Sequence, residues 1–242
     1  ANLANGYTLS LNPNGGNVGI GTTTPTTALT IRKAIASAAY GQQASMIEFK
    51  SYFPGYDTET VKSAIYSGVS GEGTLNTQGG YMSFHVNNNG TMGEKMRIEK
   101  SGIVTKPYQP SFNAYRTNSS MSIAVDDKFI FNATTHDVGG MYNTSTGRIT
   151  APVAGKYLFQ FHTIFQGNYG NTYIQFFVNN ARSYELGDYH LSQVVSATSH
   201  WQTHNFSRVI HLSANDYIDI YARSAFTWHG THWGGLSCHL LS

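Results

Sequence analysis

The sequence predicts an all-β protein in two β-rich parts, residues 1–106 and residues 107–242, which we call the stem and the head. Short segments with alternating apolar and polar residues recur along the chain, and clusters of Gly, Asn and Pro separate them. This pattern is typical of strands joined by tight turns. Two prolines within residues 106–110 stiffen the junction and prevent a strand from continuing through it. We therefore place the boundary there.

The composition describes a polar surface with few charges. Only 12% of the 242 residues are charged, against roughly 25% in average proteins. The formal net charge is +2 and the basic residues form no run, so nucleic acid and anionic membranes are not expected partners. No apolar run approaches the roughly 20 residues of a membrane span, so membrane insertion is not expected. Such a composition suits an extracellular or virion protein better than a cytosolic enzyme.

The single cysteine, Cys238, excludes an internal disulfide. We expect it to be a small buried apolar residue in the last strand. The chain starts without Met, and we expect it to be a processed or excised piece.

The stem opens with a distinctive glycine-rich segment. Residues 17–25 read NVGIGTTTP, and the short apolar run 28–31 follows. Gly19-x-Gly21 is not a dinucleotide-binding fingerprint, because position 24 is Thr and Pro25 interrupts any helix. The segment resembles those that recur in phage and other viral tail-fibre proteins, where they form small trimeric collars.

In the rest of the stem, the sequence pattern predicts short strands around residues 45–49, 63–67 and 79–86. Residues 87–90 read NNNG, which is a strong hairpin signal. Residues 94–104 are similar to a second segment found in the same viral fibres. An Ala-rich stretch, residues 34–39, is the one credible helix, of one or two turns.

The head is organised around residues 147–161. A strand ends at Pro152, the chain turns at Gly155, and a second strand follows in which Tyr157, Phe159 and Phe161 share one face. Further strands are predicted over residues 172–178, 201–212 and 217–222, the last with Ile218, Ile220 and Ala222 pointing inward. The motifs that carry a family resemblance are SFNAYR at 111–116, GGMY at 139–142, LSANDYIDI at 212–220 and GLSCHLL at 235–241.

These motifs resemble the globular head of complement, the C1q member of the C1q/TNF-like jelly rolls. The resemblance implies a ten-stranded jelly-roll sandwich that acts as a trimeric binding head, without specifying the ligand. The outer faces of residues 156–162 and 217–222 are rich in aromatic and polar side chains, and threefold packing would bury them. We therefore expect a homotrimer.

The best candidate binding site is the loop 228–233, which concentrates two Trp and two His in six residues. Its functional interpretation is an exposed recognition loop, because Trp and His can contact the CH faces and hydroxyls of sugars. The alternative is a hydrophobic plug at the end of the sandwich or a contact between subunits. The predicted ligand-binding residues are Trp228, His229, His232 and Trp233.

No metal, cofactor or catalytic group is expected. His200/His204 and His229/His232 have chelating intervals, but no third or fourth ligand accompanies either pair. Some relatives of the head bind calcium near the last strands, but residues 223–233 contain no Asp or Glu here. The carboxylate pairs with spacing suited to a glycosidase occur where solvated turn acids usually lie. These pairs are Asp126/Asp127, Glu185/Asp188 and Asp216/Asp219.

Together these features predict a non-enzymatic viral fibre protein on the virion surface or outside the cell. It would attach to a host-surface glycan or receptor through the head, and to other virion proteins through its N-terminal end. One alternative is a secreted, non-viral C1q-like adhesion or lectin module. Another is a fibre that degrades capsular polysaccharide.

Overall fold

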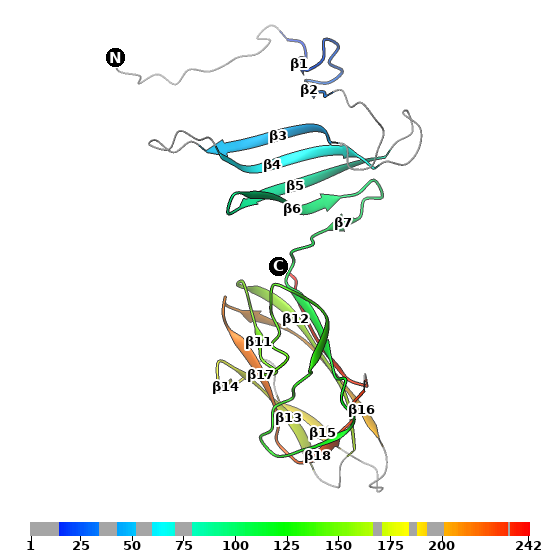
Figure 1. Cartoon of the computed structure of the whole chain (residues 1–242), viewed down its shortest axis with the longest axis vertical. Helices are drawn as coiled ribbons and strands as arrows, with labels where there is room; N and C mark the ends of the chain where they lie inside the picture. Colours follow the sequence, from blue (N-terminus) through cyan, green and yellow to red (C-terminus); the bar gives the residue numbers. More distant parts are fainter. Residues whose placement is uncertain are drawn as a thin grey trace, which may run out of the picture. The chain divides into compact units, whose positions relative to one another are not determined.

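The computed structural model describes residues 15–33, 43–51, 60–70, 79–166, 171–183, 188–192, 201–231 and 233–242. Every regular element in these residues is a strand, as Figure 1 shows. Contacts within the chain divide it into two compact units, Ala1–Pro107 and Tyr108–Ser242. The helix expected at residues 34–39 lies outside the described residues.

The glycine-rich segment forms a small closed loop. Its two strands, β1 (Val18–Ile20) and β2 (Leu29–Ile31), pair in parallel. Asn17 Nδ2 donates to the carbonyl of Pro25 at 3.0 Å and ties the loop across its base. Gly21 has φ +74°, and a side chain there would collide with the Arg32 carbonyl. Glycine is therefore required at this position for the loop to close.

The rest of the stem is one antiparallel sheet in the order β3-β4-β5-β6-β7. Its strands are β3 (Gln43–Ser51), β4 (Thr60–Val69), β5 (Gly80–Asn88), β6 (Thr91–Ile98) and β7 (Val104–Thr105). The predicted hairpin is confirmed, since Asn88 pairs with Thr91 around Asn89 and Gly90. Both turn residues have positive φ, as a two-residue hairpin of this kind requires.

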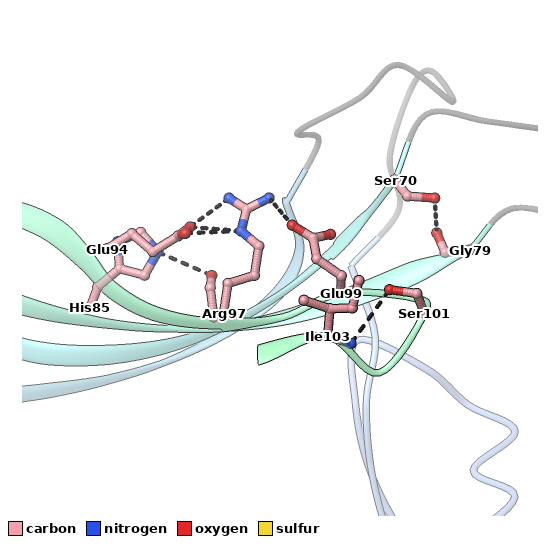
Figure 2. A network of polar contacts seen from close by, with 9 residues as sticks. Ser70, Gly79, His85, Glu94, Arg97, Glu99, Ser101 and Ile103 are labelled. Atoms are coloured by element: carbon pink, nitrogen blue, oxygen red, sulfur yellow. Dashed lines mark hydrogen bonds and ion pairs between the residues drawn. The ribbon is translucent and has the colours of Figure 1, made fainter. Parts of the chain in front are cut away.

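One face of the stem sheet carries a polar network (Figure 2). Arg97 Nε donates to Glu94 Oε1 at 2.9 Å, and the Arg97 guanidinium lies 4.1 Å from the centre of the Tyr81 ring. Ser83 hydrogen-bonds His85 Nε2 at 3.1 Å, and Glu94 lies 3.9 Å from the same nitrogen. A Ser–His–acid triad needs the hydroxyl and the carboxylate on different ring nitrogens. This arrangement is therefore a structural network.

The head contains two antiparallel sheets. The first has the order β10-β8-β19-β12-β18-β9, with β16 also pairing with β12. Its strands are β8 (Ser111–Tyr115), β9 (Met121–Ile123), β10 (Ala133–Val138), β12 (Gly155–Gln166), β16 (Gln202–Leu212), β18 (Phe226–Trp228) and β19 (Gly235–Leu240). The second has the order β11-β17-β13-β14, with β15 also pairing with β13. Its strands are β11 (Ile149–Thr150), β13 (Asn171–Val178), β14 (Ala181–Arg182), β15 (Asp188–Ser192) and β17 (Tyr217–Ala222).

The inner faces of the two sheets form one aromatic core. Tyr157, Phe159 and Phe161 are buried, which confirms the face predicted for them. Phe159 meets Phe176 of the opposite sheet with ring centroids 5.4 Å apart. Ile218, Ile220 and Ala222 are also buried in this core, as predicted. The described head has twelve strands rather than ten, and β11 and β14 have only two residues each.

The outer face of β17 is partly covered by side chains of its own chain. Arg148 lies over the Tyr217 ring at 3.8 Å, and Lys128 lies 5.4 Å from the centre of the Tyr221 ring. Between the two tyrosines, Asp219 is fully buried and bonded to both cations. Tyr217 and Tyr221 therefore have partners within one protomer. The outer face of residues 217–222 does not need threefold packing to cover these two rings.

Candidate functional site

The candidate site lies at one end of the first sheet, where β12 and β18 end and β16 begins. β12 pairs with both β16 and β18 near its last residues, with Ile164 opposite Thr203 and Phe165 opposite Trp228. Directly after β18, the His229 amide donates to the Ile164 carbonyl at 2.9 Å. The pairing of β12 with β16 brings Trp201, the residue before β16, to the same end of the sheet. Residues distant in sequence therefore meet there.

Three side chains form what we call the aromatic cluster: Trp201, His229 and Trp233. The His229 ring lies 4.4 Å from the Trp201 ring and 5.4 Å from the Trp233 ring, measured between centroids. Trp201 is 43% exposed and Trp233 is 55% exposed. Large exposed aromatic rings that already contact one another present a preformed surface with little side-chain entropy left to lose on binding.

The loop that carries His229 is held tightly against a neighbouring turn. The Thr231 amide donates to the Asn118 carbonyl at 2.8 Å. Gly230 lies so close to the same carbonyl that any side chain would collide with it. On the other side of the turn, Asn132 accepts a hydrogen bond from the Thr117 amide at 2.9 Å and donates to the Thr117 hydroxyl at 2.7 Å. These contacts fix the cluster on a rigid support.

The hydrogen bonding of His229 defines what it can offer a ligand. Nδ1 lies 2.9 Å from the Gly230 carbonyl, which can only accept. Nδ1 therefore carries the proton, and in the neutral ring Nε2 is an acceptor. An acceptor between two exposed indole rings is suited to a ligand that presents hydroxyl groups beside apolar CH surface.

The structure separates the four residues predicted for this site. His229 and Trp233 are in contact, as the recognition-loop interpretation requires. Trp228 is only 1% exposed and packs on Phe129 and Phe131, with ring centroids 4.9 and 5.1 Å away. Trp228 is therefore a core residue, because alternate side chains of β18 point into the sandwich. His232 lies outside the described residues.

Trp201 was missed as a site residue. Its sequence position, 28 residues before His229, gives no signal of proximity. Only the registers of β12 with β16 and of β12 with β18 bring the two together. The sequence therefore indicates only that Trp201 begins a strand.

The acidic residues that could have formed a catalytic pair have structural partners where the structure describes their side chains. Asp219 binds Lys128 and Arg148, while Asp216 accepts from Asn179 Nδ2 and from the Ser213 amide, both at 2.7 Å. Asp126 pairs with Arg223, and Asp127 accepts from the Ala124 amide at 2.7 Å. The side chains of Glu185 and Asp188 lie outside the described residues.

The described part of the chain has neither a metal-ligand group nor an apolar spanning helix. No group of three or more His, Cys, Asp or Glu side chains is placed to hold a metal ion there. The same residues include no helix long and apolar enough to cross a bilayer.

The fold and the site define an antiparallel jelly-roll head with a surface aromatic cluster in its end loops. Residues 111–229 match the sequence model of the C1q domain. The predicted jelly-roll fold is thereby confirmed for the head. C1q domains are commonly trimeric binding modules and are generally not enzymes.

Among solved structures, the chain is similar to the TNF protein Eiger from S. frugiperda, with 9% identity and a TM-score of 0.46. That similarity covers 55% of this chain and 93% of the other. The globular domain of the zebrafish complement 1qA protein is 17% identical, with a TM-score of 0.43, and the match covers 55% of this chain and 98% of that one. A comparison with curated protein sequences gives no match.

Proposed function

We propose that this protein is a homotrimeric attachment protein whose head binds surface carbohydrate through the aromatic cluster. The single observation that carries the proposal is the contact between Trp201, His229 and Trp233, with both indoles about half exposed. Exposing a Trp side chain to water is unfavourable in free energy, and a cluster of exposed Trp side chains is typical of binding sites.

Carbohydrate is the ligand class that this chemistry favours. Sugars present CH groups that pack on indole faces and hydroxyls that bond to an acceptor such as His229 Nε2. The three side chains of the aromatic cluster include no acidic or basic residue other than His229, so an ion pair is not the basis of recognition here. A neutral or weakly charged glycan therefore fits better than an acidic or basic protein surface.

Trimerisation would raise the overall affinity for a surface although each site is small. The C1q domain supports a trimer, and the outer face of the first sheet offers apolar side chains for it. Leu158 and Val209 pair across β12 and β16 with Val209 exposed. One cluster would bind a sugar weakly, but three copies on a rigid trimer would bind a crowded surface through avidity.

We place this function on the surface of a virus particle, as a fibre that attaches to a host cell. The glycine-rich β1–β2 loop and residues 94–104 resemble viral fibre segments, and the low charge suits an external structure. A secreted, non-viral C1q-like adhesion module would use the same site. Detection of this chain in purified virus particles would distinguish the two, and cleavage of a polysaccharide would favour the third candidate, a capsule-degrading fibre.

The proposal is tested by measuring glycan-array binding of the full chain and of the double variant Trp201→Ala/Trp233→Ala. We expect binding to fall at least tenfold, because the variant removes both indoles and leaves the buried core unchanged. Tyr108→Ala, which removes an exposed ring at the start of the head, is the matched control and should bind as wild type does. A folded double variant that binds undiminished would place the site elsewhere.

A further inference from the structure

The two faces of the stem sheet differ sharply in chemistry. Successive residues of a strand point to opposite faces, and the registers of β3, β4 and β5 assign each side chain to one of them. Met46, Tyr66 and Ser83 are cross-strand neighbours on the face that also carries the network of Figure 2. We call the opposite side the apolar face. Its six apolar residues are Ile47, Phe49, Ile65, Met82, Phe84 and Val86, and Ser63 and Ser67 lie among them.

The polar face is covered by its own side chains. Tyr66 packs edge-on against His85 with centroids 4.3 Å apart, and Arg97 stacks on Tyr81. Beneath them Ser83 is almost completely buried. The large side chains near the middle of this face therefore pack on one another within one chain.

Among the described residues, the apolar face is left more open, with only Ile31 sharing a small hollow with Ile47, Ile65 and Met82. Ile47, Phe49, Met82 and Val86 are each between 44% and 52% exposed. A sheet buries one face against another layer, and contiguous exposed apolar surface of this kind marks an interface. With strands about 4.8 Å apart and a rise of about 3.3 Å per residue, four strands of eight residues present roughly 500 Å². That is the same order as the roughly 800 Å² that each partner contributes to a stable interface.

We propose that the apolar face packs against the same face of the other copies of this chain, so that the stem has its own intersubunit core. This inference rests on the proposed trimer. The face is uncharged at the six positions that define it, so identical copies meet without repulsion and a charged partner would gain no ion pair.

The short junction to the head favours this partner over any other. β7 ends at Thr105 and β8 begins at Ser111. An extended chain spans at most about 3.5 Å per residue. The end of β7 therefore lies within roughly 20 Å of the start of β8 in each chain, and three associated heads keep the three stem sheets close to one another. The effective concentration of the other copies at the apolar face is then in the millimolar range.

The test compares two methionines on opposite faces. Met82 on the apolar face is 45% exposed and Met46 on the polar face is 41% exposed, so Met82→Cys and Met46→Cys are matched in chemistry and in exposure within one chain. The natural Cys238 is buried, and burial raises its pKa to about 12, so it reacts little. In the 242-residue chain we measure maleimide labelling rates, cross-linking by a short bis-maleimide, and mass by light scattering.

We expect Met82→Cys to label at least tenfold more slowly than Met46→Cys and to cross-link between chains. Val86→Cys is a second probe of the same face, in case one substitution disturbs the strand. A trimer whose Met82→Cys and Val86→Cys both label as fast as Met46→Cys would overturn the inference and leave the proposed trimer standing. Protection in a protein of monomeric mass would mean that the chain covers its own face, which overturns the inference and the trimer together.

Discussion

At the scale of single residues, Trp228 and Trp233 show that residue type does not determine role. They lie five positions apart in one aromatic stretch. Trp228 is in the last position of β18 and points into the sandwich, whereas Trp233 follows Gly230 and Thr231, where the chain has left the strand. The sequence indicated an aromatic site in this loop, but the assignment of each ring depends on where the strand ends.

Asp219 gives a prediction for pH dependence. Burial raises the pKa of this carboxyl, but the hydrogen bonds from Arg148 at 2.7 Å and from Lys128 at 3.0 Å outweigh burial, so the net pKa is lowered. Since the pKa in the folded protein lies below that of the unfolded chain, the stabilisation is present above about pH 4 and is lost as pH falls through the folded pKa. The substitution Asp219→Asn removes this stabilisation at neutral pH.

We expect Asp219→Asn to lower the free energy of unfolding by about 1–3 kcal/mol at pH 7. The difference from wild type should shrink towards pH 3. Urea unfolding at both pH values measures this, and Asp126→Asn, which removes an exposed carboxylate, is the control. An equal loss for Asp219→Asn at both pH values would show that the carboxylate charge is not responsible.

At the scale of elements, the sequence predicts the strands with strong alternation. It does not predict the shortest strands or which strands pair. The inward faces of β12 and β17 follow from residue alternation, and the β5–β6 hairpin follows from its turn residues. The two-residue strands β11 and β14 have no pattern long enough to detect. The meeting of Trp201 with His229 depends on long-range registers, which alternation does not encode.

The pairing of β4 with β5 gives a test of the polar face of the stem. Gly68 lies opposite Tyr81, and a side chain at Gly68 would collide with the Tyr81 ring. Gly68→Ala should displace the ring from Arg97 and destabilise the sheet by about 1–3 kcal/mol. Hydrogen exchange of the β4 and β5 amides should then accelerate. Gly80→Ala, where the nearest heavy atom is 3.6 Å away, is the control and should leave exchange unchanged.

At the scale of the whole molecule, the protein combines a jelly-roll head that matches the C1q domain model with a sheet that leaves one apolar face exposed. The resemblance of the head to C1q was visible in short motifs because they encode turns and buried strands. The exposed face of the stem was not anticipated, because its apolar residues alternate with polar ones and read as an ordinary sheet with one buried side. Both parts of the molecule favour association with further copies of the chain.

The mass of the 242-residue chain in solution tests the proposed trimer most directly. Light scattering at micromolar concentration should give three times the mass of one chain, because the match of the head to the C1q domain supports a trimer and both the avidity and the stem core are proposed for that trimer. The double variant Trp201→Ala/Trp233→Ala should have the same mass, since the cluster is assigned to ligand contact. A monomeric mass for the wild-type protein would contradict the central claim.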